Sequence, residues 1–259
     1  MWILKRIIKC PVIYVCIIVL TLLMIIGCCE DLSYAKNNNI GVLYCFVLTN
    51  SLGVSHVVAP LLVSIPFLYY YVDEIDHKYT YYQIIRANDK VKYYGAQILS
   101  AIITVLIVTI VSILCFTILC LLLGATWEPG QTMAYYYEGT FWEKYIVNGN
   151  SLFVYMVYCV CFVLYALPWP LVGIMASYIL RNRYVIVASP FIAFVFISYI
   201  TQLLSLERLD PGLTLLKGSV MYMEYGGVIH SVLYNILLTT LFIVIIFVEI
   251  KMRYKKRGI

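Results

Sequence analysis

The segment DEIDHKYTYYQIIRANDKVKYY, residues 73–94, is polar, charged and strongly aromatic, and it lies between two long apolar runs. The run before it ends in VSIPFLYYYV, and the acidic pair Asp73 and Glu74 follows directly. The next apolar run begins at Gly95. Because charged side chains are costly inside a bilayer, we expect the chain to leave the membrane at this segment and to return after it.

Within this segment, apolar and aromatic residues recur at helical spacing and alternate with basic residues. The first set is Ile75, Tyr79, Tyr82 and Ile85, and the second is Lys78, Arg86, Lys90 and Lys92. The pattern suits a short helix on the membrane surface, with tyrosines towards the headgroups and basic side chains towards water. Two interpretations remain: an ordinary interfacial loop, or a docking surface for a soluble partner.

The composition is that of a polytopic membrane protein. Of the 259 residues 63% are hydrophobic and 12% are charged, with mean hydropathy +0.92, whereas soluble domains carry about 25% charged residues. Apolar runs of about 18 residues or more predict spanning helices, and none of the runs alternates as a barrel strand would. We therefore expect an all-α fold with six spans in one domain, residues 1–259. The spans are expected at about residues 11–28, 51–72, 95–124, 152–180, 184–204 and 230–250.

Residues 1–10 place apolar side chains opposite Lys5, Arg6 and Lys9, which predicts an amphipathic helix on the inner membrane surface. A cleaved signal peptide is the alternative for the first apolar run. The sequence GCCE at residues 27–30 is a poor small-x-small cleavage site, and the run exceeds a usual signal-peptide core. We expect a retained span.

Basic residues gather on alternate connections, and Lys and Arg are retained on the cytoplasmic side of a membrane. All but four of the 18 basic residues lie in the N-terminal segment, residues 73–94, the turn at 181–183 and the C-terminal tail. We expect these parts, including both termini, on the cytoplasmic side of the membrane. The net charge of +5 then reflects topology and contact with anionic lipid headgroups, not nucleic-acid binding.

Two segments expected on the outer side of the membrane have distinctive compositions. Residues 125–150 are dense in tryptophan and tyrosine, which predicts an element resting on the outer interface. Residues 206–227 alternate apolar pieces with prolyl and glycyl breaks, and we expect them to re-enter the membrane in part.

Four prolines inside the apolar runs are candidate hinges, with ordinary kinks as the alternative. They are Pro60, Pro66, Pro168 and Pro170.

The motifs that would support chemistry within the chain are missing. The sequence holds no GxxxxGK[ST] phosphate loop, no HExxH, no GxSxG and no CxxC set, and its three histidines are scattered. We expect no catalytic residues, no cofactor and no metal in this chain.

The nine cysteines are interpreted as mostly small packing residues. Whether Cys28, Cys29 or Cys45 form a disulfide is left open by the sequence. No carboxylate occupies the middle of a run, where ion-driven transporters carry their coupling charge.

In order and content these features resemble the membrane subunits of type-2 ABC exporters, in the Gram-positive style. The likeness is strongest over residues 60–99, where that family has a proline-bearing second span, a terminal acid, an I/L-x-R-type turn and a K-Y-Y-like entry to span three. The matching positions are Asp73-Glu74, Tyr79, Ile85-Arg86 and Lys92-Tyr93-Tyr94. The family's small residue and glycine-threonine after the acid are replaced by His77-Lys78-Tyr79-Thr80.

The resemblance implies that residues 73–94 contain a coupling helix, which seats in a separate cytoplasmic ATPase carrying ATP and Mg²⁺. It implies a second permease copy or a sister permease, and export of a peptide, a lipid-like or a hydrophobic compound, as in antimicrobial-peptide or drug resistance. The ATPase-coupling residues would be Asp73, Glu74, His77, Lys78, Tyr79, Tyr82, Ile85 and Arg86. The alternative function is a non-transporting scaffold or immunity protein that binds a peptide through its outer loops.

Overall fold

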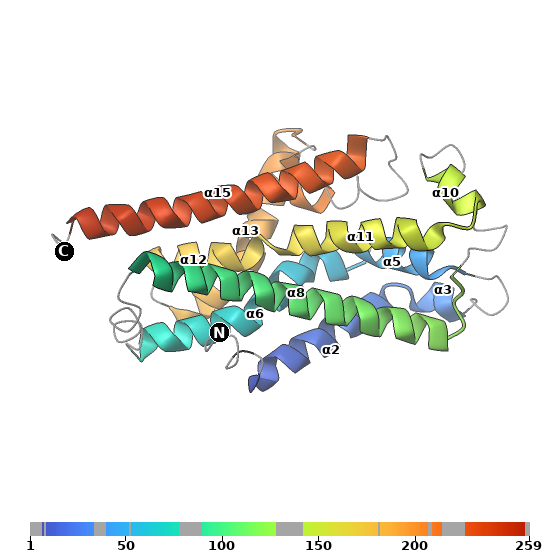
Figure 1. Ribbon diagram of the computed structural model, residues 1–259, viewed down its shortest axis with the longest axis horizontal. Helices are drawn as coiled ribbons and strands as arrows, with labels where there is room; N and C mark the ends of the chain where they lie inside the picture. Colours follow the sequence, from blue (N-terminus) through green and yellow to red (C-terminus); the bar gives the residue numbers. More distant parts are fainter. Residues whose placement is uncertain are drawn as a thin grey trace.

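The computed structural model is all-helical over the residues it describes, with one isolated parallel bridge between Gly41 and Thr126. It describes residues 7, 9–33, 40–51, 53–77, 90–127, 142–180, 182–206, 209–213 and 226–256. Figure 1 shows the longer helices extending side by side along one axis, with α13 inclined across them. The expected all-α class is confirmed for these residues.

The described helices run from α2 near the N-terminus to α15 near the C-terminus. In chain order they are α2 (Pro11–Ile26), α3 (Cys29–Ser33), α5 (Val42–Ser51), α6 (Ser55–Asp76), α8 (Lys90–Leu122), α10 (Glu143–Val147), α11 (Ser151–Ala166), α12 (Trp169–Ile179), α13 (Arg183–Leu203) and α15 (Gly226–Lys256). The end of α6, the start of α8, the end of α12 and the end of α15 lie at one end of the molecule (Figure 1). We call this the basal end and the opposite one the distal end.

Among the described residues, five helical stretches are long and apolar enough to cross a membrane. They are Ser55–Asp76, Val91–Leu122, Ser151–Ile179, Arg183–Leu203 and Val228–Met252. The first predicted run forms α2, which is apolar but has only 16 residues. The protein is thus a membrane protein with five clear spanning candidates, where the sequence predicted six.

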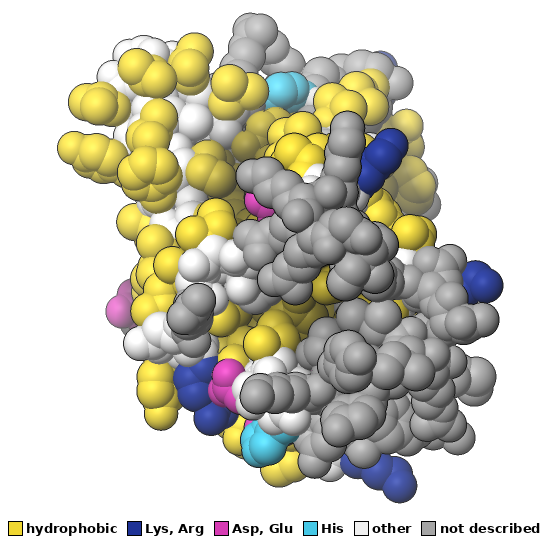
Figure 2. Space-filling view, turned by 90° about the vertical axis from the view of Figure 1, so that its left-hand side faces the viewer, with side chains coloured by type: hydrophobic (Ala, Val, Ile, Leu, Met, Phe, Trp, Pro, Cys, Tyr) yellow, Lys and Arg dark blue, Asp and Glu magenta, His cyan; other side chains and the backbone are white. Residues whose placement is uncertain are grey.

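Large apolar side chains cover the outside of the bundle, as expected for a surface in contact with lipid. Ile18, Leu114, Phe196 and Leu237, on four different helices, are each about half exposed or more. Figure 2, which looks onto the basal end, shows hydrophobic side chains over much of the described surface there too. An apolar exterior of this extent would be unstable in water, so the bundle is built for a bilayer.

The region between the first two predicted spans, where the sequence indicates no helix, contains a buried one in the structure. Its second half forms α5, in which Val42, Phe46 and Thr49 are almost completely buried. The sequence VLYCFVLT is apolar on every side, so this helix is stable only when other helices surround it. Ten residues are too few to register as a span, which is why the sequence pattern did not separate α5 from a loop.

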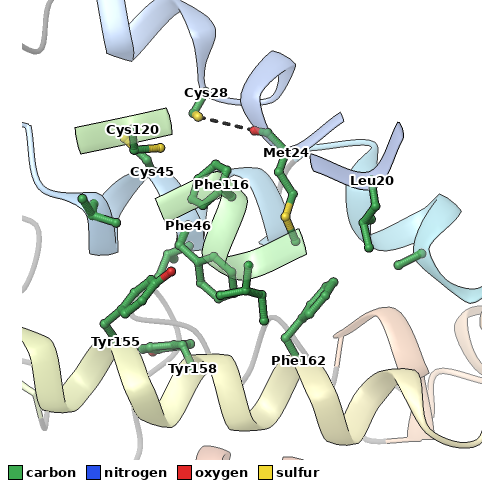
Figure 3. Close-up of a cluster of buried hydrophobic side chains, with 14 of the residues drawn as sticks. Leu20, Met24, Cys28, Cys45, Phe46, Phe116, Cys120, Tyr155, Tyr158 and Phe162 are labelled. Carbon is green, nitrogen blue, oxygen red and sulfur yellow. Dashed lines mark hydrogen bonds between the residues drawn. The ribbon is translucent and has the colours of Figure 1, made fainter. Parts of the chain in front are cut away.

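Aromatic rings from three helices form the centre of the larger core (Figure 3). Phe46 of α5 has its ring centroid 5.9 Å from that of Phe116 of α8, and 5.3 and 6.0 Å from those of Tyr155 and Phe162 of α11. Tilted and edge-to-face rings at these distances attract one another beyond the effect of their burial alone.

A second core joins α6, α8, α12 and α15 nearer the basal end. It includes Phe67, Leu68, Ala101, Leu171 and Ile246.

Helix α6 continues through two prolines, and the carbonyl freed by the first of them finds another partner. Pro60 has no N–H to donate to the carbonyl of His56, one turn earlier. The Tyr165 hydroxyl of α11 donates to this His56 oxygen at 2.7 Å. In α13, Pro190 frees the carbonyl of Ile186 in the same way, and the Ser189 hydroxyl donates to it at 2.7 Å. The carbonyl that Pro60 frees thus connects α6 to α11.

The fourth predicted span is two helices, α11 and α12, separated by Leu167 and Pro168. Pro168 is the N-cap residue of α12, and Pro170 is the second residue of this helix. The Leu171 amide donates to the Pro168 carbonyl, three residues earlier, at 3.2 Å. Further along α12, Gly173 packs so closely on Leu68 of α6 that an added Cβ would overlap the leucine methyl groups. The break therefore lies just beside a tight contact between α12 and α6.

Replacing Tyr165 with Phe removes the hydroxyl that donates to His56 and leaves that carbonyl without this donor in a buried site. We expect Tyr165→Phe to lower the free energy of unfolding by about 1–3 kcal/mol. Denaturant unfolding in detergent micelles measures the change. The control is Tyr199→Phe on the exposed face of α13, which should leave stability unchanged; equal stability of both variants would contradict the assigned role.

Candidate functional site

The predicted coupling residues fall into two groups in the structure. Asp73, Glu74 and His77 are described, at the end of α6. Lys78, Tyr79, Tyr82, Ile85 and Arg86 lie outside the described residues. The end of α6 at Asp76 and the start of α8 at Lys90 both lie at the basal end, so residues 77–90 connect two neighbouring helices there (Figure 1).

Glu74 is buried between these two helices, with 2% of its surface exposed. Its Oε1 accepts a hydrogen bond from the Tyr70 hydroxyl at 2.5 Å, one turn earlier on α6. Its Oε2 accepts from Gln97 Nε2 at 2.8 Å and from the Tyr93 hydroxyl at 3.3 Å, both on α8. Gln97 Nε2 also donates to the Tyr93 hydroxyl oxygen at 2.9 Å. We call Glu74, Tyr70, Tyr93 and Gln97 the carboxylate clamp.

The carboxylate clamp differs from the role that the sequence suggested for Glu74. As half of an acidic pair at a membrane exit, Glu74 was expected to face a partner protein, whereas in the structure it connects α6 to α8. A buried carboxylate is stable only when hydrogen bonds replace its lost hydration, and three side chains do so here. The clue available in the sequence was the spacing of four residues in Tyr70–Glu74 and in Tyr93–Gln97, which puts each pair on one helix face.

Asp73 and His77 have the opposite environment. About half of each side chain is exposed, and His77 Nδ1 lies 3.5 Å from Asp73 Oδ1 and 2.9 Å from the Asp73 carbonyl oxygen. An exposed pair of this kind contributes little to stability. These two side chains are therefore accessible at the point where the chain leaves α6, and among the described coupling candidates they are the best placed to contact another molecule.

Tyrosines extend the carboxylate clamp to a third helix, α12. The Tyr71 hydroxyl lies 3.3 Å from the Ser177 hydroxyl. The Tyr94 ring has its centroid 6.3 Å from that of Tyr178 and 5.1 Å from that of Tyr93. Since Tyr71 and Tyr93 are both buried, the ends of α6, α8 and α12 are packed into one unit around the base of residues 77–90.

The candidate hinges lie away from this unit, towards the middle of the bundle. Pro60 and Pro66 are inside α6, 8 to 14 residues before Glu74 in sequence. Pro168 and Pro170 are at the break between α11 and α12. Both pairs of prolines thus lie where the helical ladder of backbone hydrogen bonds is interrupted.

A second buried carboxylate, Asp210, was not singled out by the sequence. It is 1% exposed, and Oδ1 accepts from the Ser198 hydroxyl at 2.8 Å and from the Gly212 amide at 2.9 Å. Gln202 Nε2 donates to Oδ2 at 3.0 Å. These bonds fix the chain after α13 onto α13 itself, which is a structural role.

The carboxylate clamp makes a direct prediction for stability. Truncation by Glu74→Ala leaves the donors of Gln97 and Tyr93 buried without their acceptor, and we expect a loss of about 1–3 kcal/mol. Asp76→Ala, two residues later on the same helix, removes an exposed carboxylate and should change stability by no more than about 0.5 kcal/mol. Denaturant titration of both variants in micelles tests this difference, and similar losses would refute a specific role for Glu74.

Comparisons of the chain with protein-family models, with curated proteins and with solved structures gave no match.

Proposed function

We propose that this chain is the membrane permease subunit of an ATP-driven exporter of the type-2 ABC class. A separate cytoplasmic ATPase would supply the free energy, and two permease subunits would form the pathway. The observation that carries the proposal is the carboxylate clamp. Residues 77–90 join α6 to α8 in the chain, and Glu74 of α6 bonds to Gln97 of α8 near that connection. A partner pressing on this segment would move both helices together.

The chemistry of the sequence supports an external energy source. The chain contains no phosphate loop, and cradling the phosphates of ATP needs those backbone amides and the lysine. A mechanical connection to another protein would then provide what the chain lacks. Asp73 and His77, exposed beside the clamp, would lie at the contact with the ATPase.

In this proposal the basal end faces the bacterial cytoplasm. It carries the end of α15, where Lys251 is exposed, and Arg183, the first residue of α13, in keeping with the retention of basic residues on that side. Helix α2 would be the sixth span. Its 16 residues extend about 24 Å, short of a hydrocarbon core of about 30 Å, and local thinning of the bilayer accommodates such a mismatch.

Transport would proceed by rigid-body movement of the basal unit. ATP-driven closure of the ATPase pair would displace residues 77–90. Helices α6 and α12 would then turn about Pro60, Pro66, Pro168 and Pro170, and the permease would alternate between inward-facing and outward-facing states. The cargo would be a peptide, a lipid-like or another hydrophobic compound, in keeping with the family that the sequence resembles.

The proposed ATPase should be recoverable with the permease. Purification of the chain from its native membrane in mild detergent should co-elute a polypeptide that carries a phosphate loop and is labelled by a photoreactive ATP analogue. Mass spectrometry identifies the polypeptide. An isolated chain that protects cells against a peptide with no ATP-binding companion would instead support the scaffold or immunity alternative.

Charge reversal within the coupling segment should weaken the complex. Arg86→Glu reverses a charge within residues 77–90, and we expect it to reduce co-purification of the ATPase at least tenfold while the permease still inserts. Lys251→Glu makes the same reversal at the exposed end of α15 and serves as the matched control. Immunoblotting of both subunits gives the ratio; an unchanged ratio for Arg86→Glu would remove the segment from the interface.

A further inference from the structure

Helix α15 lies at the edge of the bundle, where it packs against α11 and α12 (Figure 1). Of its spanning stretch, Val228–Met252, 28% is buried, against 61% for the corresponding stretch of α6. One face of α15 carries apolar side chains that are more than half exposed, as contact with lipid requires. They include Leu233, Leu237, Leu241 and Val244. The helix is therefore attached to the bundle along its opposite face.

This opposite face combines apolar and polar side chains. Phe242 and Ile246 on it belong to the core shared with α6, α8 and α12, so the face points inward. Ser231 and Asn235, one turn apart, are 0% and 1% exposed, and Glu249 is partly buried. At 3.6 residues per turn, Ser231 and Glu249 are about five full turns apart and lie on the same side of the helix.

We call Ser231, Asn235 and Glu249 the polar stripe of α15. At 1.5 Å per residue the stripe extends about 27 Å, close to the 30 Å or so of the hydrocarbon core of a bilayer. It therefore follows the inward face of α15 across almost the whole thickness of a membrane.

The polar stripe contains hydrogen-bonding atoms that the described part of the chain leaves without a partner. Asn235 Nδ2 donates to the Ser231 carbonyl at 2.9 Å. Ser231 Oγ, Asn235 Oδ1 and Glu249 Oε2 are buried, and no described residue forms a hydrogen bond with any of them. Burying such atoms costs free energy of folding, and apolar side chains would attach α15 at lower cost. Polar residues inside membrane helices often face a water-filled cavity or a substrate path.

We propose that the polar stripe lines a cargo path between α15 and the pair α11 and α12, and that the cargo is a peptide. In this structure the path is closed, because Ser231 and Asn235 are covered. A turn of α12 about Pro168 and Pro170 would part it from α15 and expose the stripe to water and cargo. The inference rests on the proposed transport function and adds to it the lining helix and the class of cargo.

The spacing of the stripe suits a peptide backbone. Ser231 and Asn235 are about 6 Å apart along the helix axis, and each presents an oxygen that can accept a hydrogen bond. In an extended peptide, the N–H groups on one side recur at every second residue, about 6.8 Å apart. Such a peptide can donate to both oxygens at once, whereas the hydrocarbon chain of a lipid would leave both without a partner.

Cysteine replacements test whether water reaches the polar stripe. Native membrane vesicles carrying Ser231→Cys or Asn235→Cys are exposed on both sides to a charged methanethiosulfonate, which reacts with thiolates in water. Mass spectrometry of the digested chain separates these adducts from those of the nine native cysteines. We expect labelling at both positions to exceed that of Leu237→Cys, on the lipid-facing side of α15, at least tenfold.

Absence of labelling at both stripe positions, or equal labelling at Leu237→Cys, would overturn the path. Ser231→Cys exchanges an oxygen for a sulfur, so it carries the test if Asn235→Cys fails to fold.

A matched pair of probes tests the class of cargo. A short synthetic leucine-alanine peptide should slow the labelling of Ser231→Cys at least threefold, because it donates hydrogen bonds along the stripe. The fully N-methylated form of the same peptide has no backbone N–H donors and should leave the labelling rate unchanged. Equal protection by both forms, or protection by neither, would overturn the assignment of a peptide.

The path and the ATP-driven function fail separately. An ATPase that co-purifies with the chain, together with an unlabelled stripe, would reject the path along α15 and retain the transport function. A labelled stripe in a chain with no ATP-binding companion would reject ATP-driven export and retain the water-accessible stripe.

Discussion

A polar group enclosed in this bundle must find its partner inside the protein, because neither lipid nor a packed core supplies one. The Glu74 carboxylate meets this requirement with three side chains from two helices. The His56 carbonyl, freed by Pro60, meets it with the Tyr165 hydroxyl, and Asp210 with Ser198, Gln202 and the Gly212 amide. Apolar surfaces alone would let these helices slide past one another, whereas a polar contact between two helices fixes one at a set height against the other.

These contacts lie at different levels along the bundle. The carboxylate clamp and the tyrosines around it bind α6, α8 and α12 together at the basal end. Prolines interrupt the helical hydrogen bonds farther along α6 and at the α11–α12 break. At the other end, the Thr49 hydroxyl of α5 bonds to the Met24 carbonyl of α2, and Thr126, just beyond α8, bonds to the backbone of residues 40 and 42. In the proposed function, movement of the basal unit would pass through these proline-bearing regions towards the distal end.

Sequence patterns were sufficient for features that depend on local composition. Long apolar runs predicted the helices, and the closely spaced pair Pro168 and Pro170 predicted the interruption between α11 and α12, because each proline lacks the backbone N–H that a continuous helix uses. Patterns failed where stability comes from distant neighbours. Helix α5 is short and apolar all round, and only burial distinguishes it from a loop. The bond from Tyr165 to His56 joins residues 109 positions apart, which no local spacing specifies. The four-residue spacing places Tyr70 and Glu74 on one face of α6, but the bond between Glu74 and Gln97 of α8 joins residues 23 positions apart.

The proposed seating of an ATPase on residues 77–90 is tested most directly by a photoreactive amino acid placed at position 82 and, for comparison, at Tyr145 near the distal end, followed by irradiation of intact cells. We predict that position 82 is cross-linked to a polypeptide with a phosphate loop and that position 145 is not. The opposite pattern, or capture of such a polypeptide at neither position in cells that contain the working complex, would contradict the proposed coupling.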